Sequence, residues 1–464
     1  MTIRVESSSE GNLSGHRVVV MGLGRFGGGV GAVRYLVRRG AQVLVTDTLG
    51  AERLSHSLRQ LEDLDDVEYR LDGHDIRDFT NTDMVVVNPA VDRRKNHFLR
   101  AACATGARLT SEIELLVCAL PNRDRTIAVT GTAGKSTVTA MIAHVLGQPE
   151  ANQALEPAQV WMGGNIGGSL LGQIDAMAQM DWVVLELSSF MLESIADVGF
   201  SPRVAIVTNL APNHLDRHVT FNAYIQAKQV ILRYQQAGDV VVFGPNVAQV
   251  MDAGLGQLDQ IEAVTPLLGP LHLPGHHNRI NGSLAIAAVG HCAVAPHFAA
   301  AALENFPGLP HRTQQVANVA AVRCYNDSKS TTPESACLAI DAFDARSVHV
   351  ILGGYDKGSD LRKLILHAAR RCRGIYTIGD TGQAITAAAA AEPGGAYAIY
   401  CGNLECAVRE ALRHARDGEV LLLSPGCASW DQFENYEQRG DMFTELVRSH
   451  ADAIGHITSS REGA

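Results

Sequence analysis

Residues 128–137 read AVTGTAGKST, and this stretch decides how the central part of the chain folds. It follows the run Thr126–Val129 and precedes a helical pattern that continues through Leu146. A glycine-rich turn that enters a helix offers backbone N–H groups to a phosphate, and an adjacent lysine adds a point charge. The stretch therefore predicts a phosphate-binding loop. The general pattern GxxxxGK[ST] requires glycine at Val129, so only a shorter form is matched, and a purely structural turn is the alternative.

Short β-branched runs alternate with helical patterns along the chain. The runs are Val18–Met21, Val43–Thr46, Met84–Val87, Ile127–Val129, Val183–Leu185, Val204–Thr208, Val240–Phe243, Val348–Leu352, Ile375–Ile378 and Val420–Leu423. This alternation predicts βαβ units, mostly parallel sheets and an α/β fold. Many runs end in Gly, Asp, Asn or Ser, at the sheet edge where open α/β sheets bind ligands.

The length of 464 residues predicts more than one domain. Composition shifts at Pro121–Asp124 and at Phe306–Pro310 place the expected boundaries. We therefore expect three domains, formed by residues 1–120, 121–309 and 310–464.

Composition narrows the class of protein. The chain has 39 Lys and Arg against 49 Asp and Glu, a net charge of −10, which argues against nucleic-acid binding and a polybasic membrane patch. Its nine cysteines are scattered and form no CxxC pair, which favours reduced thiols in the cytoplasm. No apolar leader and no run of about 18 apolar residues is present, so we expect neither secretion nor membrane insertion.

Two further strand ends carry candidate ligands. Glu186 follows Val183–Leu185 and is the expected magnesium ligand, although a lone glutamate at a strand end is equally often a cap. His214 lies in APNHLDRH, after Val204–Thr208. This segment lacks HExxH and has no cysteine partner, so a magnesium or phosphate contact is more credible than zinc, and an ordinary polar loop is the alternative.

The first glycine-rich turn, Gly22–Gly27, follows Val18–Met21, and Asp47 ends the next run. This spacing is the GxGxxG dinucleotide fingerprint with an acid about 20 residues later. Any nucleotide diphosphate fits the same helix N-terminus, and a structural turn is the alternative.

A larger set of motifs extends over nearly the whole chain. In order they are TGTAGKST, GGNIGGSL, ELSSFMLE, NHLDRH, YIQAK, PGHHNRIN, LPHRT, NDSKSTTPES, LGGYDKGSD and SPGCASWDQF. This set resembles the Mur ligases. LPHR, NDSK, SPGCAS, DQF and EQRG are specific to the branch that adds D-glutamate to UDP-N-acetylmuramoyl-L-alanine.

The resemblance implies a fold and an activity. It implies an N-terminal Rossmann-like domain that binds the UDP moiety, a central P-loop ATPase domain and a C-terminal Rossmann-like domain that receives the amino acid. The γ-phosphoryl of ATP would activate a carboxylate as an acyl phosphate, and the glutamate amine would attack it to form an amide, in cytoplasmic peptidoglycan precursor synthesis. ATP and Mg²⁺ are the implied cofactors, the two substrates are the implied partners, and a monomer is expected.

The resemblance also implies roles for individual residues. Those for catalysis are Lys135, Glu186, His214 and Lys228, with Lys228 carbamylated. Those for the metal are Ser136, Glu186, His214 and Lys228. Those for ATP are Gly131, Thr132, Ala133, Gly134, Lys135, Ser136, Thr137, Asn278, Asn281, Arg312, Asp327 and Lys329. Those for the two substrates are Gly24, Arg25, Asp47, Thr48, Asn165, Ser188, Thr331, Lys357, Ser429 and Tyr436.

Several positions depart from the family pattern. Ala133 replaces Asn, Met191 replaces Gln, Trp430 replaces a smaller apolar residue, Gln314 replaces Glu, and Arg25-Phe26 replaces a small hydroxyl residue.

Three alternatives to this function stay open. One is another amide ligase of the superfamily, such as a folylpolyglutamate synthase relative or a ligase for a different amino acid. The others are a nicotinamide-dependent oxidoreductase and a non-catalytic nucleotide-binding regulator.

Overall fold

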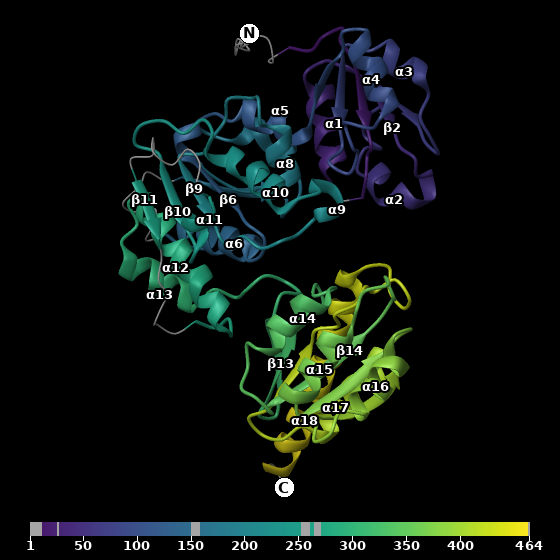
Figure 1. Ribbon diagram of the computed structural model, residues 1–464, viewed down its shortest axis with the longest axis vertical. Helices are drawn as coiled ribbons and strands as arrows, with labels where there is room; N and C mark the ends of the chain where they lie inside the picture. The colour runs from purple at the N-terminus through teal and green to yellow at the C-terminus, as the bar shows by residue number, and fades with distance from the viewer. Residues whose placement is uncertain (1–11, 26, 150–157, 252–259, 264–270, 463–464) are drawn as a thin grey trace. The chain divides into compact units, whose positions relative to one another are not determined.

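The structure is a computed structural model that describes residues 12–25, 27–149, 158–251, 260–263 and 271–462 (Figure 1). The chain divides into two compact units. The first comprises residues 1–267 and 280–303, and the second comprises residues 268–279 and 304–464. Each unit is described by itself.

The first sheet of the first unit has the strand order β3-β2-β1-β4-β5, with every pair parallel. Its elements are β1 (Arg17–Met21), α1 (Gly28–Arg38), β2 (Gln42–Thr46), α2 (Ala51–Arg59), β3 (Val67–Arg70), α3 (Ile76–Thr80), β4 (Met84–Val87), α4 (His97–Ala104), β5 (Arg108–Thr110) and α5 (Glu112–Ala119). Val18 and Val20 enter one apolar core, and Val19 and Met21 enter another. Both faces of β1 are therefore buried, as in a doubly wound fold.

The second sheet has the order β11-β10-β9-β6-β8-β7, again with every pair parallel. Its strands are β6 (Thr126–Thr130), β7 (Val160–Gly164), β8 (Trp182–Glu186), β9 (Val204–Val207), β10 (Val240–Phe243) and β11 (Gln260–Ala263). The helices are η1 (Arg123–Arg125), α6 (Lys135–Leu146), η2 (Leu171–Ala176), α8 (Ser189–Ser194), α9 (Leu215–His218), α10 (Phe221–Gln229), η3 (Val230–Leu232), α11 (Val247–Val250), α12 (His276–Gly290) and α13 (Pro296–Glu304). Because β6 lies between β8 and β9, its carboxyl end meets the ends of both neighbours.

The second unit contains the third sheet, in the order β12-β13-β17-β14-β15-β16. Only the pair β12–β13 is antiparallel. The elements are β12 (Gln314–Val319), β13 (Val322–Asn326), α14 (Pro333–Ile340), β14 (Val348–Gly353), α15 (Arg362–Arg371), β15 (Gly374–Ile378), α16 (Gly382–Ala390), β16 (Tyr397–Gly402), α17 (Leu404–His414), β17 (Val420–Leu423) and α18 (Tyr436–Glu462). Separate apolar cores cover the two faces of this sheet.

The structure confirms the predicted α/β fold with largely parallel sheets. The runs Met84–Val87, Val240–Phe243 and Val420–Leu423 coincide with β4, β10 and β17. The six edge strands and β13 coincide with none of the predicted runs. Edge strands such as β12, with the sequence QQVANV, are half exposed and carry polar residues, so they lack a continuous apolar run.

The three sheets fall within residues 1–120, 121–309 and 310–464. The domain boundaries at these positions stay predictions. Among the described residues, no helix combines the length and the apolar character that a membrane-spanning helix needs.

Candidate active site

The glycine-rich turn joins the end of β6 to the start of α6. Gly131 and Gly134 have φ angles of 141° and 81°, which side chains rarely adopt. A Cβ atom at Gly131 would collide with Thr208, and one at Gly134 would lie 2.6 Å from Asn281 Oδ1. Both glycines are therefore required by backbone angle and by space, and the turn places the N-terminus of α6 at the carboxyl edge of the sheet.

The segment after β9 holds this turn in place. Asn209 accepts hydrogen bonds from the Thr132 amide at 2.9 Å and, through Oδ1, from the Ala133 amide at 3.0 Å. Thr208 Oγ1 donates to the Ala133 carbonyl at 2.6 Å. The sequence analysis did not single out Thr208 and Asn209. Their position at the carboxyl end of the run Val204–Thr208, in AIVTNLAPN, was the available signal.

Two of the predicted site residues form hydrogen bonds with a third, Glu186. Ser136 Oγ donates to Glu186 Oε2 at 2.6 Å, and Asn165 Nδ2 donates to Glu186 Oε1 at 2.8 Å. Glu186 is buried, with an exposed fraction of 1%. Lys135, the residue before Ser136, donates from Nζ to the Thr132 carbonyl at 3.0 Å. A hydroxyl and a carboxylate thus converge next to the turn.

Lys228 on α10 is also buried at this place, with 1% exposure. Its Nζ donates to the Gly131 carbonyl at 2.8 Å and to Thr130 Oγ1 at 3.2 Å, and it lies 4.7 Å from the centre of the Tyr224 ring. Burial, helped by the charge of Lys135 and opposed by Glu186, lowers the pKa of Lys228 to about 6. The amine is therefore mainly neutral near pH 7.

His214 lies near this group but in an aromatic setting. Its ring is 5.2 Å from the Phe190 ring and 6.4 Å from that of Tyr224. His218, four residues later, bonds Ser189 Oγ at 2.9 Å and stacks on Phe190. The side chain of Asp216 lies outside the described residues.

Magnesium suits the donors at Glu186 better than a transition metal does. Among the described residues, no group of three or more His, Cys, Asp or Glu side chains is placed to hold a metal ion. Mg²⁺ commonly uses one or two protein oxygens and completes its shell with water and substrate phosphates. The Ser136 hydroxyl and the Glu186 carboxylate fit that requirement.

In the first sheet, Asp47 organises the other glycine-rich turn. Its carboxylate accepts from the Gly24 amide at 3.1 Å and from the Leu49 amide at 2.9 Å. Arg25 and Thr48 are exposed beside it, and Phe26 lies outside the described residues. Asn88 donates to the Gly22 carbonyl at 3.1 Å, a contact that the sequence analysis did not expect.

Three other predicted residues of the central sequence lie on helices. Ser188 is the N-cap of α8 and accepts from the Met191 amide at 3.2 Å. Asn278 and Asn281 are three residues apart on α12, and each is 5% exposed. Asn278 Nδ2 donates to the Pro274 carbonyl at 2.7 Å.

In the second unit, Asp327 follows β13 and is enclosed by hydroxyl groups. It accepts from the amide and the Oγ1 of Thr313 at 3.0 and 3.1 Å, and from Ser424 Oγ at 2.7 Å. Burial raises the pKa of the Asp327 carboxyl to about 6, although these hydrogen bonds act in the opposite direction. Asp327 therefore fixes neighbouring segments, and Arg312, next to Thr313, is half buried.

The remaining predicted residues follow the carboxyl ends of β13, β14 and β17 in the same unit. Lys329 Nζ donates to Tyr436 Oη at 2.6 Å, and the Thr331 amide donates to the Lys329 carbonyl. Lys357 Nζ lies 4.4 Å from the centre of the Trp430 ring. Trp430 is 57% exposed, whereas the adjacent Ser429 is buried.

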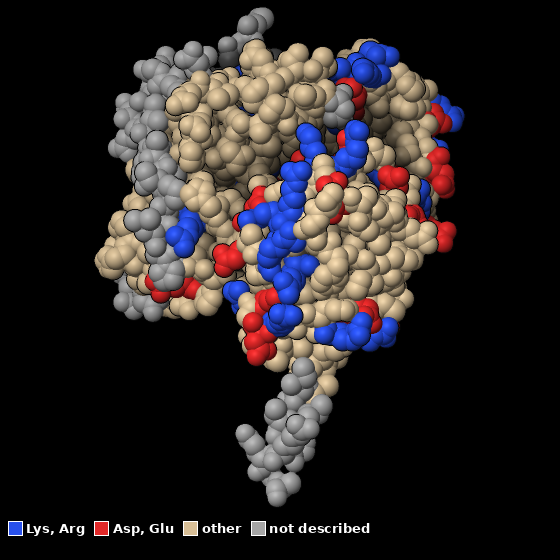
Figure 2. Space-filling view, turned by 60° about the horizontal axis from the view of Figure 1, so that its bottom comes forward, with Lys and Arg blue, Asp and Glu red and all other residues tan. Residues whose placement is uncertain are grey.

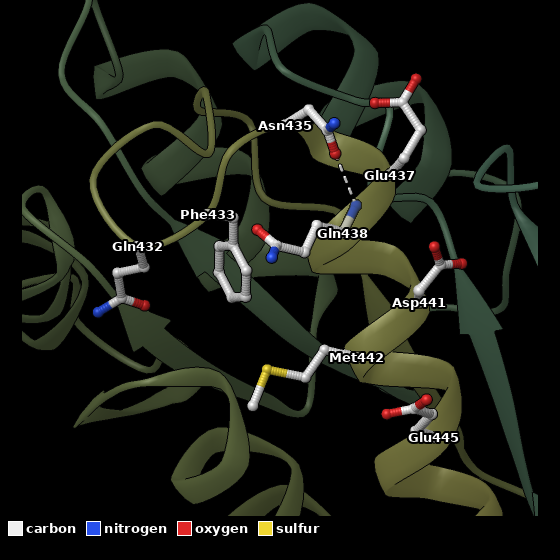
Figure 3. A pocket seen from close by; sticks show the side chains of 8 residues that line it. All are labelled: Gln432, Phe433, Asn435, Glu437, Gln438, Asp441, Met442 and Glu445. Atoms are coloured by element: carbon white, nitrogen blue, oxygen red, sulfur yellow. Dashed lines mark hydrogen bonds between the residues drawn. The ribbon is translucent and has the colours of Figure 1, made fainter. Parts of the chain in front are cut away.

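The surface adds two features. Figure 2 shows Lys and Arg side chains gathered in a band on the face that it displays, so the net charge of −10 does not exclude local basic surface. A depression of about 650 Å³ lies at the start of α18, and Figure 3 shows the side chains that line it. It is lined by Gln432, Phe433, Asn435, Glu437, Gln438, Asp441, Met442 and Glu445.

Comparisons with known proteins agree with this architecture. Three family models match the chain. They are the Mur ligase MurD-like N-terminal domain over residues 16–111, the Mur ligase middle domain over residues 129–253 and the Mur ligase glutamate ligase domain over residues 311–427. The UDP-N-acetylmuramoylalanine--D-glutamate ligase of Acidobacterium capsulatum is 34% identical over 97% of this chain and 99% of its own length. The chain belongs to the Mur ligase family.

Two further comparisons extend this result. A second Mur ligase relative, the UDP-N-acetylmuramoylalanine--D-glutamate ligase of Pelotomaculum thermopropionicum, is 34% identical over 93% of this chain and 97% of its own length. The solved structure of UDP-N-acetylmuramate-alanine ligase from Thermotoga maritima has a TM-score of 0.57 and 20% identity, and the match covers 94% of this chain and 99% of that one. The Mur ligase fold therefore extends over nearly the whole chain.

Proposed function

We propose that this Mur ligase joins D-glutamate to UDP-N-acetylmuramoyl-L-alanine at the expense of ATP, through an acyl phosphate, in peptidoglycan precursor synthesis. One observation carries the proposal. A chain that aligns end to end with relatives of that activity has Lys135, Ser136, Glu186 and Lys228 together at the turn after β6. The cytoplasm fits the four buried cysteine thiols, Cys292, Cys324, Cys372 and Cys427.

The turn after β6 is the proposed ATP site. Its amides at the start of α6, with the Lys135 ammonium, bind the outer phosphates and stabilise the charge that develops during phosphoryl transfer. Ser136 and Glu186 would hold Mg²⁺, which supplies further charge neutralisation when bound. Asn165 orients the Glu186 carboxylate through its 2.8 Å hydrogen bond. The resulting acyl phosphate must be kept from water until the amine attacks it.

The second unit is proposed to receive the amino acid. Glutamate presents two carboxylates, which require a cation and hydroxyl or amide donors. Lys357 supplies the cation, and Thr331 and Ser429 supply donors from two further strand ends. The Lys357 ammonium lies over the face of the Trp430 ring. We also propose that the enzyme acts as a monomer.

The proposal is tested by measuring phosphate release from ATP by the full-length chain. Reactions contain UDP-N-acetylmuramoyl-L-alanine with D-glutamate, L-glutamate, meso-diaminopimelate or no amino acid, and each is repeated without the UDP substrate. Release that needs both the UDP substrate and D-glutamate supports the proposal. Release with a different amino acid would support the alternative amide ligase, and the absence of ATP turnover in every reaction would contradict both.

A further inference from the structure

Arg439 is a fully buried cation at the start of α18, and the predicted roles do not include it. Its exposure is 0%, and it is the bulkiest fully buried side chain among the residues that the structure describes. Its Nε donates to Ser328 Oγ at 3.0 Å, and its Nη2 donates to the Ser328 carbonyl at 2.8 Å. Its Nη1 donates to the carbonyls of Cys427 and Ala428, each at 3.2 Å. One guanidinium therefore joins three separate segments of the chain.

Each of these segments carries residues proposed to bind substrate. Ser328 lies between Asp327 and Lys329, in the segment that follows β13 and leads to Thr331. Cys427 and Ala428 directly precede Ser429, in the segment that follows β17. Ser328 Oγ also donates to the carbonyl of Tyr436, at the start of α18 itself. Arg439 thus sets the relative positions of Asp327, Lys329, Ser429 and Tyr436.

A fourth segment depends on the same group indirectly. The amide of Tyr355 donates to the Ala428 carbonyl at 2.9 Å, so the segment after β14 is held against the one after β17. A Cβ atom at Gly354 would lie 2.2 Å from that carbonyl and 3.3 Å from Arg439 Nη1. Lys357 follows two residues after Tyr355, so it belongs to a segment that is bonded to the same Ala428 carbonyl as Arg439.

The electrostatics of Arg439 are unusual for a structural residue. Among the described residues, no carboxylate lies within the 4.0 Å of an ion pair with its guanidinium. Burial lowers the pKa of Arg439 to about 10, so the side chain still carries its charge at pH 7. Burying a charge is costly, and here a hydroxyl, backbone carbonyls and the more distant charge of Asp431 compensate it. A buried cation is therefore retained in contact with the segments that we propose receive a dicarboxylate anion.

We propose that Arg439 is a positioning residue for the ligase reaction, because its guanidinium fixes the segments after β13 and β17 in the arrangement that receives the incoming amino acid. The proposal rests on the proposed function of these segments. The planar fork of the guanidinium is essential, because its N–H donors are spread over three nitrogen atoms. A lysine carries its N–H donors on a single nitrogen, so it does not span Ser328, Cys427 and Ala428 together.

The test replaces the fork and keeps the charge. Arg439→Lys in the full-length chain is expected to raise the apparent KM for glutamate about ten-fold or more, because the donors of the pocket lose their spacing. The KM for the UDP substrate should stay within about two-fold, since the hydrogen bonds of Arg439 hold segments of the second unit itself. The matched control is Arg448→Lys, the same change at an exposed arginine of α18, which should leave both KM values unchanged.

Two further measurements separate positioning from general stability. Ser328→Ala removes the partner of Nε and should shift the glutamate KM in the same direction by a smaller factor. Arg439→Ala should regain glutamate-dependent turnover when millimolar guanidinium is added, and Arg448→Ala should not respond. If Arg439→Lys does not fold, Ser328→Ala decides the matter.

The outcomes distinguish this inference from the proposed function. A lowered melting temperature with an unchanged glutamate KM, in Arg439→Lys or in a folded Ser328→Ala, would show that Arg439 is only a packing element and would overturn the inference. If the unmodified chain shows no glutamate-dependent phosphate release, the proposed function fails instead, before any variant is compared.

Discussion

At the scale of single residues, Lys228 shows what burial adds to a sequence motif. In YIQAK, the neighbours of Lys228 do not decide between an exposed helix lysine and a lysine of the active site. The structure places it at 1% exposure beside the Gly131 carbonyl. A lysine with a pKa of about 6 is mainly neutral near pH 7, and the neutral amine is the form that reacts with carbon dioxide to give a carbamate.

We predict that Lys228→Arg is nearly as inactive as Lys228→Ala. Arginine keeps a positive charge but forms no carbamate, and a cation beside Ser136 and Glu186 would repel a magnesium ion. Phosphate release measures the effect, and Lys95→Arg, at an exposed position of the same unit, is the control. High activity of the arginine variant would exclude the carbamate.

The lowered pKa of Lys228 also sets a direction for stability. In the unfolded chain this amine has its ordinary pKa of 10.5, against about 6 in the folded chain. Between these values the unfolded chain binds a proton that the folded chain does not, so the free energy of unfolding falls as the pH falls from about 10 to about 6. In carbon dioxide-free buffer, Lys228→Met should lose this part of the pH dependence.

Lys135 gives a second prediction at this scale. Lys135→Ala should reduce turnover by about 10²–10³ or more, because it removes the cation nearest the transferred phosphoryl group. The fold should persist, since the packing of aromatic residues does not depend on Lys135. Near-ultraviolet circular dichroism reports that packing. Near-normal turnover by the folded variant would remove the turn after β6 from the catalytic site.

Lys357 belongs to the amino-acid pocket rather than to the ATP site. Losing one charge-assisted hydrogen bond typically costs about 1.5–3 kcal/mol, so Lys357→Ala should raise the glutamate KM by about ten-fold to a hundred-fold. The KM for ATP should change far less. Lys363→Ala, at an exposed position on α15, is the matched control. An equal effect on both substrates would place the glutamate carboxylates elsewhere.

At the scale of elements, the segment between β7 and η2 links the two sheets of the first unit. Asn165 reaches Glu186 with both its amide and its side chain, and four residues later Ser169 Oγ donates to Glu112 at the start of α5. Helix α1 comes so close that a Cβ atom at Gly31 would lie 2.3 Å from Ser169 Oγ. The position of Asn165, which bonds Glu186, therefore depends on α1, a helix of the first sheet.

Gly31→Ala tests this packing. Inserting a methyl group into a filled site should cost about 1–3 kcal/mol in the free energy of unfolding, and it should lower turnover as the Asn165 segment shifts. Gly28→Ala is the control, since it lies on the same helix and a Cβ atom there meets nothing within 4 Å. Adding Ser169→Gly to Gly31→Ala should restore part of the stability, and urea titration measures all three.

The same scale shows which parts of the fold the sequence could predict. Buried central strands such as β4 and β10 are continuous apolar runs, and the sequence analysis located them to the residue. Edge strands are half exposed, so their patterns resemble loops. The residues of the candidate site divide in the same way, into motif positions and contacts between distant segments. Motif positions such as Ser136 and Glu186 could be predicted, whereas the contacts of Asn209, Asn88 and Arg439 depend on segments that meet only after folding.

At the scale of the whole molecule, the second unit has the properties of an independent domain. Its sheet is formed entirely by strands between Gln314 and Leu423, and both of its apolar cores lie between Val316 and Ala451. The only further chain that it includes is the short segment 268–279. A sheet with both faces covered by its own helices can bury its apolar residues without another unit.

We therefore predict that residues 304–464 fold as an isolated fragment. Urea unfolding followed by circular dichroism should show one cooperative transition, with a slope of about 1–3 kcal/mol per molar urea. The matched control is residues 324–464, which lack β12, the start of β13 and Thr313. Removing Thr313 takes away two of the hydrogen bonds to Asp327, and a buried carboxyl that loses its donors is destabilising. The shorter fragment should thus unfold without a cooperative transition. A longer fragment that also unfolds gradually would show that segment 268–279 or the first unit is needed for this core, and the boundary near residue 310 would then not separate two folding units.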